Sequence, residues 1–268
     1  MDPQAFVPPM LAVSGPAAFS DPDWWFEPKW DGFRAQLAVT DRVSIRSRQG
    51  ESLLERFPTL SATAEAVHAP AVLDGEVVAW HEGRVDFHAL TRGRGELVLV
   101  LFDCLYDRSG WLLAEPWAVR REHLEAVVRP GGAVMVCPGV PERGEDLFHA
   151  TGRLGLEGVV GKRRGSRYWP GRRTPAWRKF VHGEDLTVEV RALTTQGGRW
   201  IADVGAVGQR PILARVRVPT APIGVQPPPE GARRDLPPGI LATVRYRART
   251  PHGQLRHAVF RGYGNASP

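Results

Sequence analysis

Apolar and polar residues alternate over residues 34–39 and 43–47, and the short polar segment 40–42 separates the two runs. Because successive side chains of a strand point to opposite faces of a sheet, this pattern predicts a β-hairpin. The mostly apolar segments 71–80 and 97–105 predict two further strands, of which the second is buried. Apolar residues at helical spacing predict helices over three further segments, which are 51–67, 115–128 and 143–154.

The pattern changes after Phe180, where short strand candidates alternate with turns rich in glycine or proline. Five such strands in a short stretch suit a small barrel of the oligonucleotide-binding type. The proline-rich segment 219–238 is expected to be a long loop without folded elements. A boundary near residue 183 divides the chain into domains of residues 1–182 and 183–268. The expected strands are 187–193, 199–207, 212–218, 240–249 and 257–261.

Composition narrows the class of protein. Hydrophobic residues make up 43% of the chain, which is enough for a packed core. The net charge of +6 suggests a polyanionic partner, and nucleic acid is favoured over a membrane because no apolar run reaches about 18 residues. Cys104 and Cys137 do not have a metal-ligand spacing, so a reducing cytoplasm is the expected compartment. Residues 1–16 lack the features of a signal peptide.

Lysine is rare among the 35 basic residues, and it occurs at positions 29, 162 and 179 alone. Arginine normally keeps its proton, whereas a lysine with a lowered pKa can act as an amine nucleophile. Lys29 lies in an expected turn between Pro28 and Gly32, where its side chain would be presented to a ligand. Taken alone, a lysine in such a turn is more often a solvated surface charge than a nucleophile.

Two carboxylates and one aromatic residue are further candidates. Glu76 lies inside an apolar strand and Glu157 precedes an apolar segment, so each calls for a metal, a cation or a hydroxyl partner. Pairing with structural arginines is the alternative for both. Phe102, at the end of the 97–105 segment, could stack on a base or belong to the core.

The motifs occur in a fixed order along the chain, and together they resemble those of the covalent nucleotidyltransferase superfamily, within it the ATP-dependent DNA ligases. The resemblance is to the short stand-alone bacterial type similar to ligase C. It implies an α+β fold, with an adenylation domain of antiparallel sheets and flanking helices followed by an OB-fold barrel. The matching segments are Lys29–Arg34, Ser47–Gly50, Leu73–Glu76, Asp86–Leu90 with Arg92, Leu101–Asp103, Glu157–Lys162 and Trp177–Lys179.

The resemblance also implies a mechanism, in which Lys29 attacks the α-phosphate of ATP to form a lysine–AMP adduct. The AMP then passes to a DNA 5′-phosphate, and a 3′-hydroxyl displaces it and seals the nick. Mg²⁺ or Mn²⁺ would assist, held by Glu157. The implied nucleotide contacts are Arg34, Arg48 and Glu76 on the sugar or phosphates, Phe102 and Glu27 on adenine, and Lys162 and Lys179 on phosphates.

Two departures from the family pattern concern the first step. Val181 stands where a second lysine is common, and no Asp-Lys pair follows Arg261. The expected partner is nicked double-stranded DNA, with the break-repair protein Ku suggested by family analogy, and the expected state is a monomer at the bacterial nucleoid. An RNA ligase, an mRNA-capping guanylyltransferase, and a nucleic-acid-binding relative with weakened catalysis are the alternatives.

Overall fold

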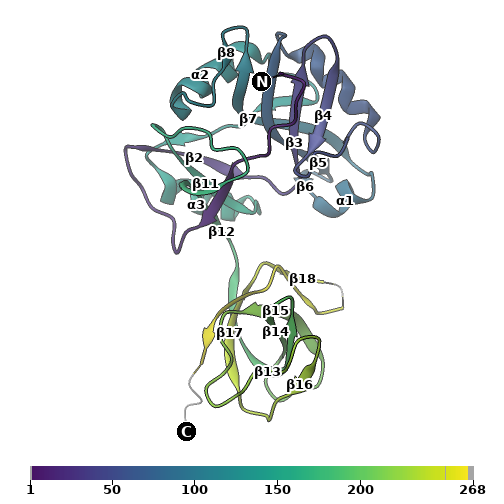
Figure 1. Ribbon diagram of the computed structural model, residues 1–268, viewed down its shortest axis with the longest axis vertical. Helices are drawn as coiled ribbons and strands as arrows, with labels where there is room; N and C mark the ends of the chain where they lie inside the picture. Colours follow the sequence, from purple (N-terminus) through teal and green to yellow (C-terminus); the bar gives the residue numbers. More distant parts are fainter. Residues whose placement is uncertain (1, 251, 265–268) are drawn as a thin grey trace. The chain divides into compact units, whose positions relative to one another are not determined.

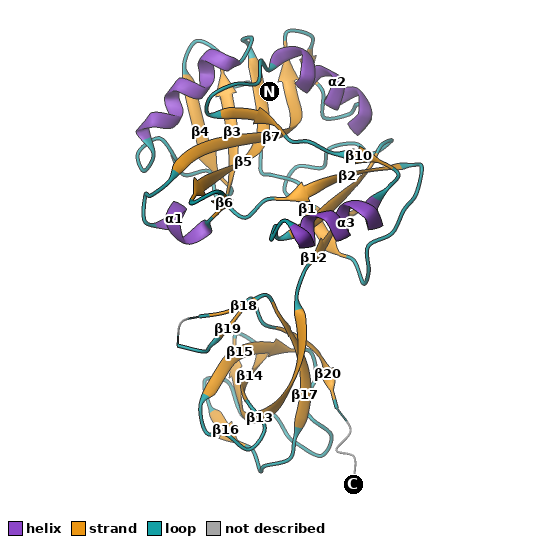
Figure 2. Cartoon of the chain, turned by 180° about the vertical axis from the view of Figure 1, so that it is seen from behind, coloured by secondary structure: helices purple, strands orange, loops and turns teal. Residues whose placement is uncertain are grey.

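The structure is a computed structural model that describes residues 2–250 and 252–264. The chain forms two compact units, Met1–Val181 and His182–Pro268 (Figure 1). Strands predominate in both units, and all the helices that the structure describes lie in the first (Figure 2). None of these described helices is long and apolar enough to cross a membrane.

A large, mainly antiparallel sheet forms one layer of the first unit. Its main strands run in the order β4-β3-β5-β7-β8, with β6 beside β5 and β9 parallel to β7. The predicted hairpin and the two predicted strands are confirmed as β3–β4, β5 and β7. The strand bounds are β3 Phe33–Val39, β4 Val43–Ser47, β5 Ala71–His81, β6 Arg84–Val85, β7 Glu96–Asp107, β8 Gly110–Trp111 and β9 Val134–Val136.

A smaller sheet forms the second layer of this unit, in the order β1-β12-β11-β2-β10. Strand β1 runs parallel to β12, and the other pairs are antiparallel. The sheet joins segments from both ends of the unit's sequence. Its strands are β1 Leu11–Ser14, β2 Trp24–Lys29, β10 Val140–Pro141, β11 Gly158–Arg163 and β12 Arg173–Val181.

The helices pack against strands of these sheets. Besides α1 (Phe87–Thr91), the unit contains α2 (Trp117–Val127) and α3 (Gly144–Arg153), which confirm two predicted helices. The predicted helix 51–67 is wrong in extent and type, because only Pro58–Ala66 is helical and it is a 3₁₀-helix, η1. Pro58 has no N–H group to donate, so a continuous helix could not run through it. The backbone N–H of Leu53 instead donates to Ile45 in β4.

Alternation along the strands divides the large sheet between two cores. Leu37, Leu73 and Leu101 point to one side, into a cluster completed by η1, α1 and α2. Their neighbours Val72 and Val100 point to the other side, toward the small sheet. The facing surfaces of the two sheets therefore enclose side chains from every second position of each strand.

The second unit is a small barrel around a separate apolar core that includes Val190, Val204 and Val244. Its strands run in the order β15-β14-β13-β17-β20, with β16 beside β13, and β18 and β19 form a two-stranded ribbon. The bounds are β13 Glu184–Gln196, β14 Arg199–Gly205, β15 Ile212–Val218, β16 Arg233–Asp235, β17 Leu241–Tyr246, β18 Ala248–Arg249, β19 Leu255–Arg256 and β20 Val259–Tyr263.

One loop prediction and one strand prediction in this unit need correction. The segment 219–238 is not wholly loop, since β16 pairs its residues with 192–194 of β13. The strand expected over 257–261 begins at Val259 instead, because His257 adopts the left-handed conformation, with φ of 53°, which interrupts an extended strand.

Candidate functional site

A cavity of about 190 Å³ opens between the facing surfaces of the two sheets of the first unit. All but one of the predicted site residues line it: Glu27, Lys29, Arg34, Arg48, Glu76, Phe102, Lys162 and Lys179. The remaining one, Glu157, forms an ion pair with Lys29. The sequence motifs therefore converge on a single site.

Strand register explains the convergence on the small sheet. Glu27 and Lys29 are two positions apart on β2, so both side chains point to the same face. On neighbouring β11, Val160 pairs with Glu27, and Lys162 lies two positions further along on the same face. Lys179 on β12 pairs with Val160 and extends the row.

The large sheet contributes the opposite wall of the cavity. Arg34 on β3 and Glu76 on β5 are direct cross-strand partners, so their side chains emerge side by side. Phe102 on β7 lies beneath Arg34, whose guanidinium carbon is 4.6 Å from the ring centroid. The cavity is thus lined by cations, carboxylates and an aromatic ring, and each of the two sheets contributes both acidic and basic side chains.

Lys29 ends β2 at a point of close backbone approach. A Cβ on Gly32 would lie 2.0 Å from the Val77 carbonyl oxygen, so the turn after Lys29 requires glycine. The Lys29 ammonium donates a hydrogen bond to Glu157 Oε2, both side chains are partly exposed, and Lys29 lines the cavity. The amine therefore lies next to an acceptor and remains accessible.

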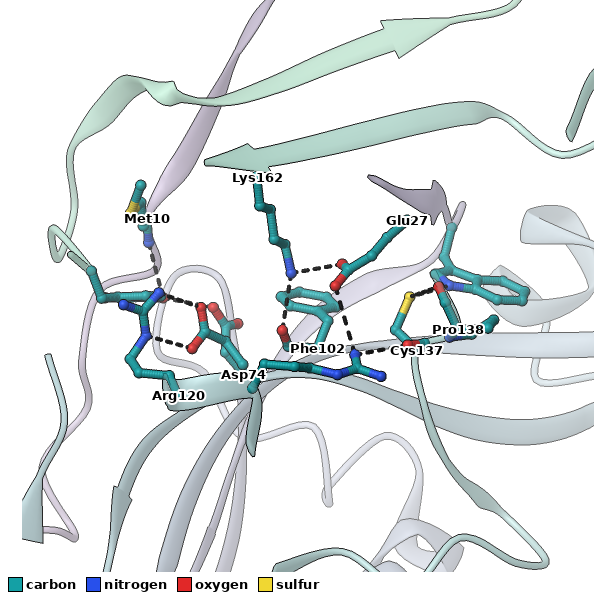
Figure 3. A network of polar contacts seen from close by, with 12 residues as sticks. Met10, Glu27, Asp74, Phe102, Arg120, Cys137, Pro138 and Lys162 are labelled. Carbon is teal, nitrogen blue, oxygen red and sulfur yellow. Dashed lines mark hydrogen bonds and ion pairs between the residues drawn. The ribbon is translucent and has the colours of Figure 1, made fainter. Parts of the chain in front are cut away.

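Lys162, for which the resemblance implies a phosphate contact, lines the cavity and is engaged by protein groups. Its side chain is buried, with the ammonium 2.7 Å from Glu27 Oε2 and 2.9 Å from the Phe102 carbonyl oxygen (Figure 3). The same ammonium lies 4.4 Å and 4.6 Å from the ring centroids of Phe102 and Trp177. Lys162 is thus engaged by protein groups on several sides.

Arg34 is held rigidly from behind. Its guanidinium makes two hydrogen bonds of 2.6 Å to the carboxylate of Asp74. The Tyr168 hydroxyl donates to the same carboxylate at 2.6 Å and accepts the backbone N–H of Met10. This network fixes the fork of Arg34 at the edge of the cavity and ties down the N-terminal segment before β1.

The electrostatic environment separates two ends of the cavity. Burial, together with the nearby cations Lys29, Arg173 and Arg48, lowers the pKa of Lys179. These four basic residues form a strongly positive end that suits phosphate groups. Burial raises the pKa of Glu76 to about 7, although Arg34 and Lys29 lower it.

A divalent metal ion has one carboxylate available at the positive end, that of Glu157. Within the part of the chain that the structure describes, no three His, Cys, Asp or Glu side chains cluster as a preformed metal site. Mg²⁺ is commonly held by one or two carboxylates together with substrate phosphates, so this donor set fits an ion that arrives with a nucleotide.

Sequence reasoning gave no role to three residues that shape the site. Arg173 and Trp177 line the cavity. Arg121 on α2 reaches toward Glu27, with 3.7 Å between Nη1 and Oε1. Trp177 stands in a recognised motif and could have been flagged by its neighbour Lys179. Arg121 carries no local signal, because it is a polar position in an ordinary amphipathic helix.

The fold of two sheets around a basic cavity, followed by a small barrel, is that of a covalent nucleotidyltransferase with an OB-fold domain. The chain belongs to the family described as ATP dependent DNA ligase domain, whose family model matches residues 9–180.

Among relatives, the multifunctional non-homologous end joining DNA repair protein LigD of Mycobacterium tuberculosis is 32% identical over 95% of this chain. The chain spans 38% of the length of that protein. The prophage-derived DNA ligase-like protein LigB of Bacillus subtilis is 26% identical, with 96% of this chain and 99% of the relative covered. The crystal structure of the ligase domain of M. tuberculosis LigD matches with a TM-score of 0.63 and 29% identity, covering 96% of this chain and 95% of that one.

Proposed function

We propose that this protein is an ATP-dependent DNA ligase that seals nicks through a covalent lysine–AMP intermediate. Residues 1–182 would form the adenylation domain and residues 183–268 the OB-fold domain. The observation that carries the proposal is the position of Lys29, whose amine lies in the cavity beside Glu157 and next to the cations of the positive end. A related mycobacterial DNA ligase D has been solved with ATP bound, which supports the choice of nucleotide.

ATP would lie along the cavity with its base at one end and its phosphates at the other. Phe102 and Glu27 lie at the end where the aromatic rings gather, and they would contact adenine. Glu76 would accept a hydrogen bond from a ribose hydroxyl, and Arg34 would contact the sugar or the phosphates. The α-phosphate would then face Lys29, with Lys179 and Arg48 neutralising its charge.

The first chemical step needs Lys29 as a free amine. Glu157 Oε2 already accepts a hydrogen bond from Lys29 Nζ, so it is placed to receive the proton that the amine must lose. The Lys29 N–P bond forms as the bond between the α-phosphate and the pyrophosphate leaving group breaks. Glu157 and the ATP phosphates would hold Mg²⁺ or Mn²⁺, which would supply positive charge near the leaving group.

The choice of a nucleic-acid substrate rests on the net charge of the chain and on its similarity to LigD. A net charge of +6, carried mainly by arginine, suits binding to a phosphate backbone. The name of LigD places that relative in non-homologous end joining, and DNA ends are therefore the proposed context for this chain in a bacterial cell. A contact with the end-joining protein Ku is proposed by analogy alone.

Covalent labelling with α-labelled ATP and Mg²⁺ tests the proposal. We expect ATP to label the native protein and to leave Lys29→Ala and Lys29→Arg unlabelled. Alanine has no amine, and arginine keeps its proton near neutral pH and is not a nucleophile. The matched variant Lys179→Arg keeps a phosphate-binding charge and should retain part of the label. Labelling by GTP and not by ATP would indicate a capping-type enzyme. No labelling by either nucleotide would favour a nucleic-acid-binding protein without this activity. A comparison of the sealing of nicked DNA and nicked RNA then shows whether the substrate strand is DNA or RNA.

A further inference from the structure

One oxygen of the buried Glu27 carboxylate has no hydrogen-bond partner within the described structure. Glu27 is 2% exposed, and its Oε2 accepts from Lys162 while Oε1 has no donor. Arg121 Nη1 lies 3.7 Å from Oε1, which is too far for a hydrogen bond. A buried carboxylate oxygen without a donor is destabilising, and this one belongs to a residue that lines the cavity. Oε1 is therefore an unused acceptor on a residue of the cavity wall.

The ammonium of Lys162 has its contacts inside the protein. Two of its three donors are directed to Glu27 Oε2 and the Phe102 carbonyl oxygen (Figure 3). The rings of Phe102, Trp177 and Trp117 surround it, with centroids at 4.4, 4.6 and 5.7 Å. Since the side chain is 1% exposed, its charge acts on Glu27 and not on a distant phosphate.

Burial and Lys162 act in opposite directions on Glu27. Burial raises the pKa of its carboxyl group, and Lys162 is the main group that lowers it, ahead of Arg121. An ionised carboxylate is an acceptor only, whereas a protonated carboxyl group also donates through its O–H. The charge on Lys162 thus opposes the net rise in the pKa of Glu27 and favours the ionised form, which only accepts hydrogen bonds.

We propose that Lys162 is a positioning residue that sets base selectivity, because its ammonium keeps Glu27 oriented and restricted to accepting hydrogen bonds. The inference rests on the proposed function, in which the base lies against Glu27. Adenine offers a 6-amino donor to Oε1, whereas hypoxanthine and guanine present a 6-oxo acceptor that a carboxylate repels. Selectivity for a 6-aminopurine would therefore require the cation behind the carboxylate, in addition to the carboxylate itself.

The test compares covalent labelling by ATP and by ITP, whose bases differ in the 6-substituent and in the proton on N1, and whose sugar and triphosphate are the same. In the native protein we expect strong preference for ATP. In Lys162→Met, the ratio of ATP to ITP labelling rates should fall on the order of 10- to 100-fold, the range expected for one hydrogen bond to a charged group. The remaining preference should decrease further as pH falls, because the Glu27 carboxyl group then gains its proton more readily.

A double-mutant comparison distinguishes action through Glu27 from general damage. Glu27→Gln, whose amide can both donate and accept, should lose the same selectivity without pH dependence. In the Glu27→Gln background, Lys162→Met should leave the ATP to ITP ratio unchanged. Arg121→Met, which removes the more distant cation, should lower the ratio less than Lys162→Met, and it tests the same inference if Lys162→Met does not fold.

The outcomes separate this inference from the proposed function. Absence of labelling of the native protein by either nucleotide would contradict the proposed function. Normal labelling of the native protein, with an equal loss of ATP and ITP labelling in Lys162→Met and no change in their ratio, would overturn the inference and return Lys162 to a phosphate contact or a structural role. Retained selectivity in Lys162→Arg, with lost selectivity in Lys162→Met, would support it, since the arginine keeps the charge.

Discussion

Individual charged residues in the first unit are buried in pairs, and this pairing shapes the cavity. Arg34 with Asp74, Lys162 with Glu27, and Arg120 with Asp103 each join a cation to a carboxylate at 2.6 to 2.7 Å. A buried charge is tolerated when its partner and further hydrogen bonds satisfy it. Among the residues that the structure describes, Glu76 has no such close partner, and burial is the largest influence on its pKa.

Glu76 should make stability depend on pH. Its pKa is raised from an ordinary 4.5 to about 7 in the folded protein, so the folded state holds a proton that the unfolded state has released across that interval. The free energy of unfolding of the native protein, relative to Glu76→Gln, should therefore fall as pH rises from 4.5 to 7, by on the order of 3 kcal/mol. Urea denaturation at several pH values measures this difference. A difference that does not vary with pH would contradict the raised pKa.

The Arg120–Asp103 pair provides a second prediction at this scale. Both side chains are fully buried, and the guanidinium also donates to the carbonyl oxygens of Glu115 and Ser166. Arg120→Met leaves a buried carboxylate unpaired and should lower the free energy of unfolding by about 3–5 kcal/mol. The exposed pair of Arg143 with Asp146 is the control, since Arg143→Met should change stability by less than about 1 kcal/mol. Equal effects at the two sites, measured by denaturant titration, would show that burial does not decide the outcome.

Among the elements, the β2–β11–β12 strands determine whether the site forms, because they carry Glu27, Lys29, Lys162 and Lys179. Gly158 begins β11 between two neighbours and pairs with both Lys29 and Val181. Its φ is 150°, and a Cβ there would lie 2.0 Å from the Phe180 carbonyl oxygen. This glycine allows β11 to approach both partners next to Glu157.

Gly158→Ala should therefore separate β11 from β12 and reduce Lys29 labelling at least tenfold, with a loss of stability of about 2–4 kcal/mol. Gly155→Ala is a matched control, because Gly155 also has a positive φ, of 66°, but has no atom within 4 Å of the added Cβ. The control should lose about 1 kcal/mol of stability and keep its labelling. Thermal unfolding and the labelling assay measure both effects, and a Gly158→Ala variant that behaves like the control would refute the steric argument.

Sequence patterns predicted the strands better than the other elements. The alternation over 34–39 and 43–47 is regular because one face of the hairpin packs on the core, so β3 and β4 appear where expected. The spacing of Leu53, Phe57 and Leu60 suggested an α-helix, but such spacing also fits a bridged turn followed by a 3₁₀-helix. The spacing of apolar residues alone does not reveal that Pro58 interrupts an α-helix.

The candidate site shows a similar division. Motif residues on alternate strand positions could be assigned to one pocket from the sequence, because register makes their directions predictable. The partner of Lys162 could not, since its position depends on burial between β11 and the Phe102 region of the opposite sheet. The position of Arg121 near Glu27 could not be predicted from the sequence either, because it depends on how α2 packs against β7.

Considered as a whole molecule, the chain carries the proposed nucleotide pocket in one of its two compact units. The cavity residues all belong to Met1–Val181, and the apolar core of His182–Pro268 is separate from the cores of the first unit. A domain with its own core can in principle fold alone. Nucleotide binding and nucleic-acid binding should thus be separable.

A fragment of residues 1–181 should fold and bind ATP with a dissociation constant within about fivefold of that of the whole chain, a difference of less than about 1 kcal/mol. Equilibrium binding of ATP to both proteins, each carrying Lys29→Ala to prevent reaction, measures the comparison. A folded fragment that no longer binds ATP would mean that residues beyond 181 contribute to the pocket. The nick-sealing reaction should be lost in the fragment, because DNA binding would need both units.

The register of β2 against β11 also determines how the protein tolerates changes in length. Phe26 lies in the cluster behind the small sheet, while its neighbour Glu27 faces the cavity. Inserting or deleting one residue within Trp24–Lys29 would exchange these two sets, turning the amine of Lys29 away from the cavity while leaving the composition of the strand almost intact. Substitutions along this strand would therefore be graded in effect, whereas single-residue insertions and deletions would be all-or-none. Length variation among functional descendants of this chain should accordingly be confined to the loops, and the segment 219–230 is the place where it should accumulate first.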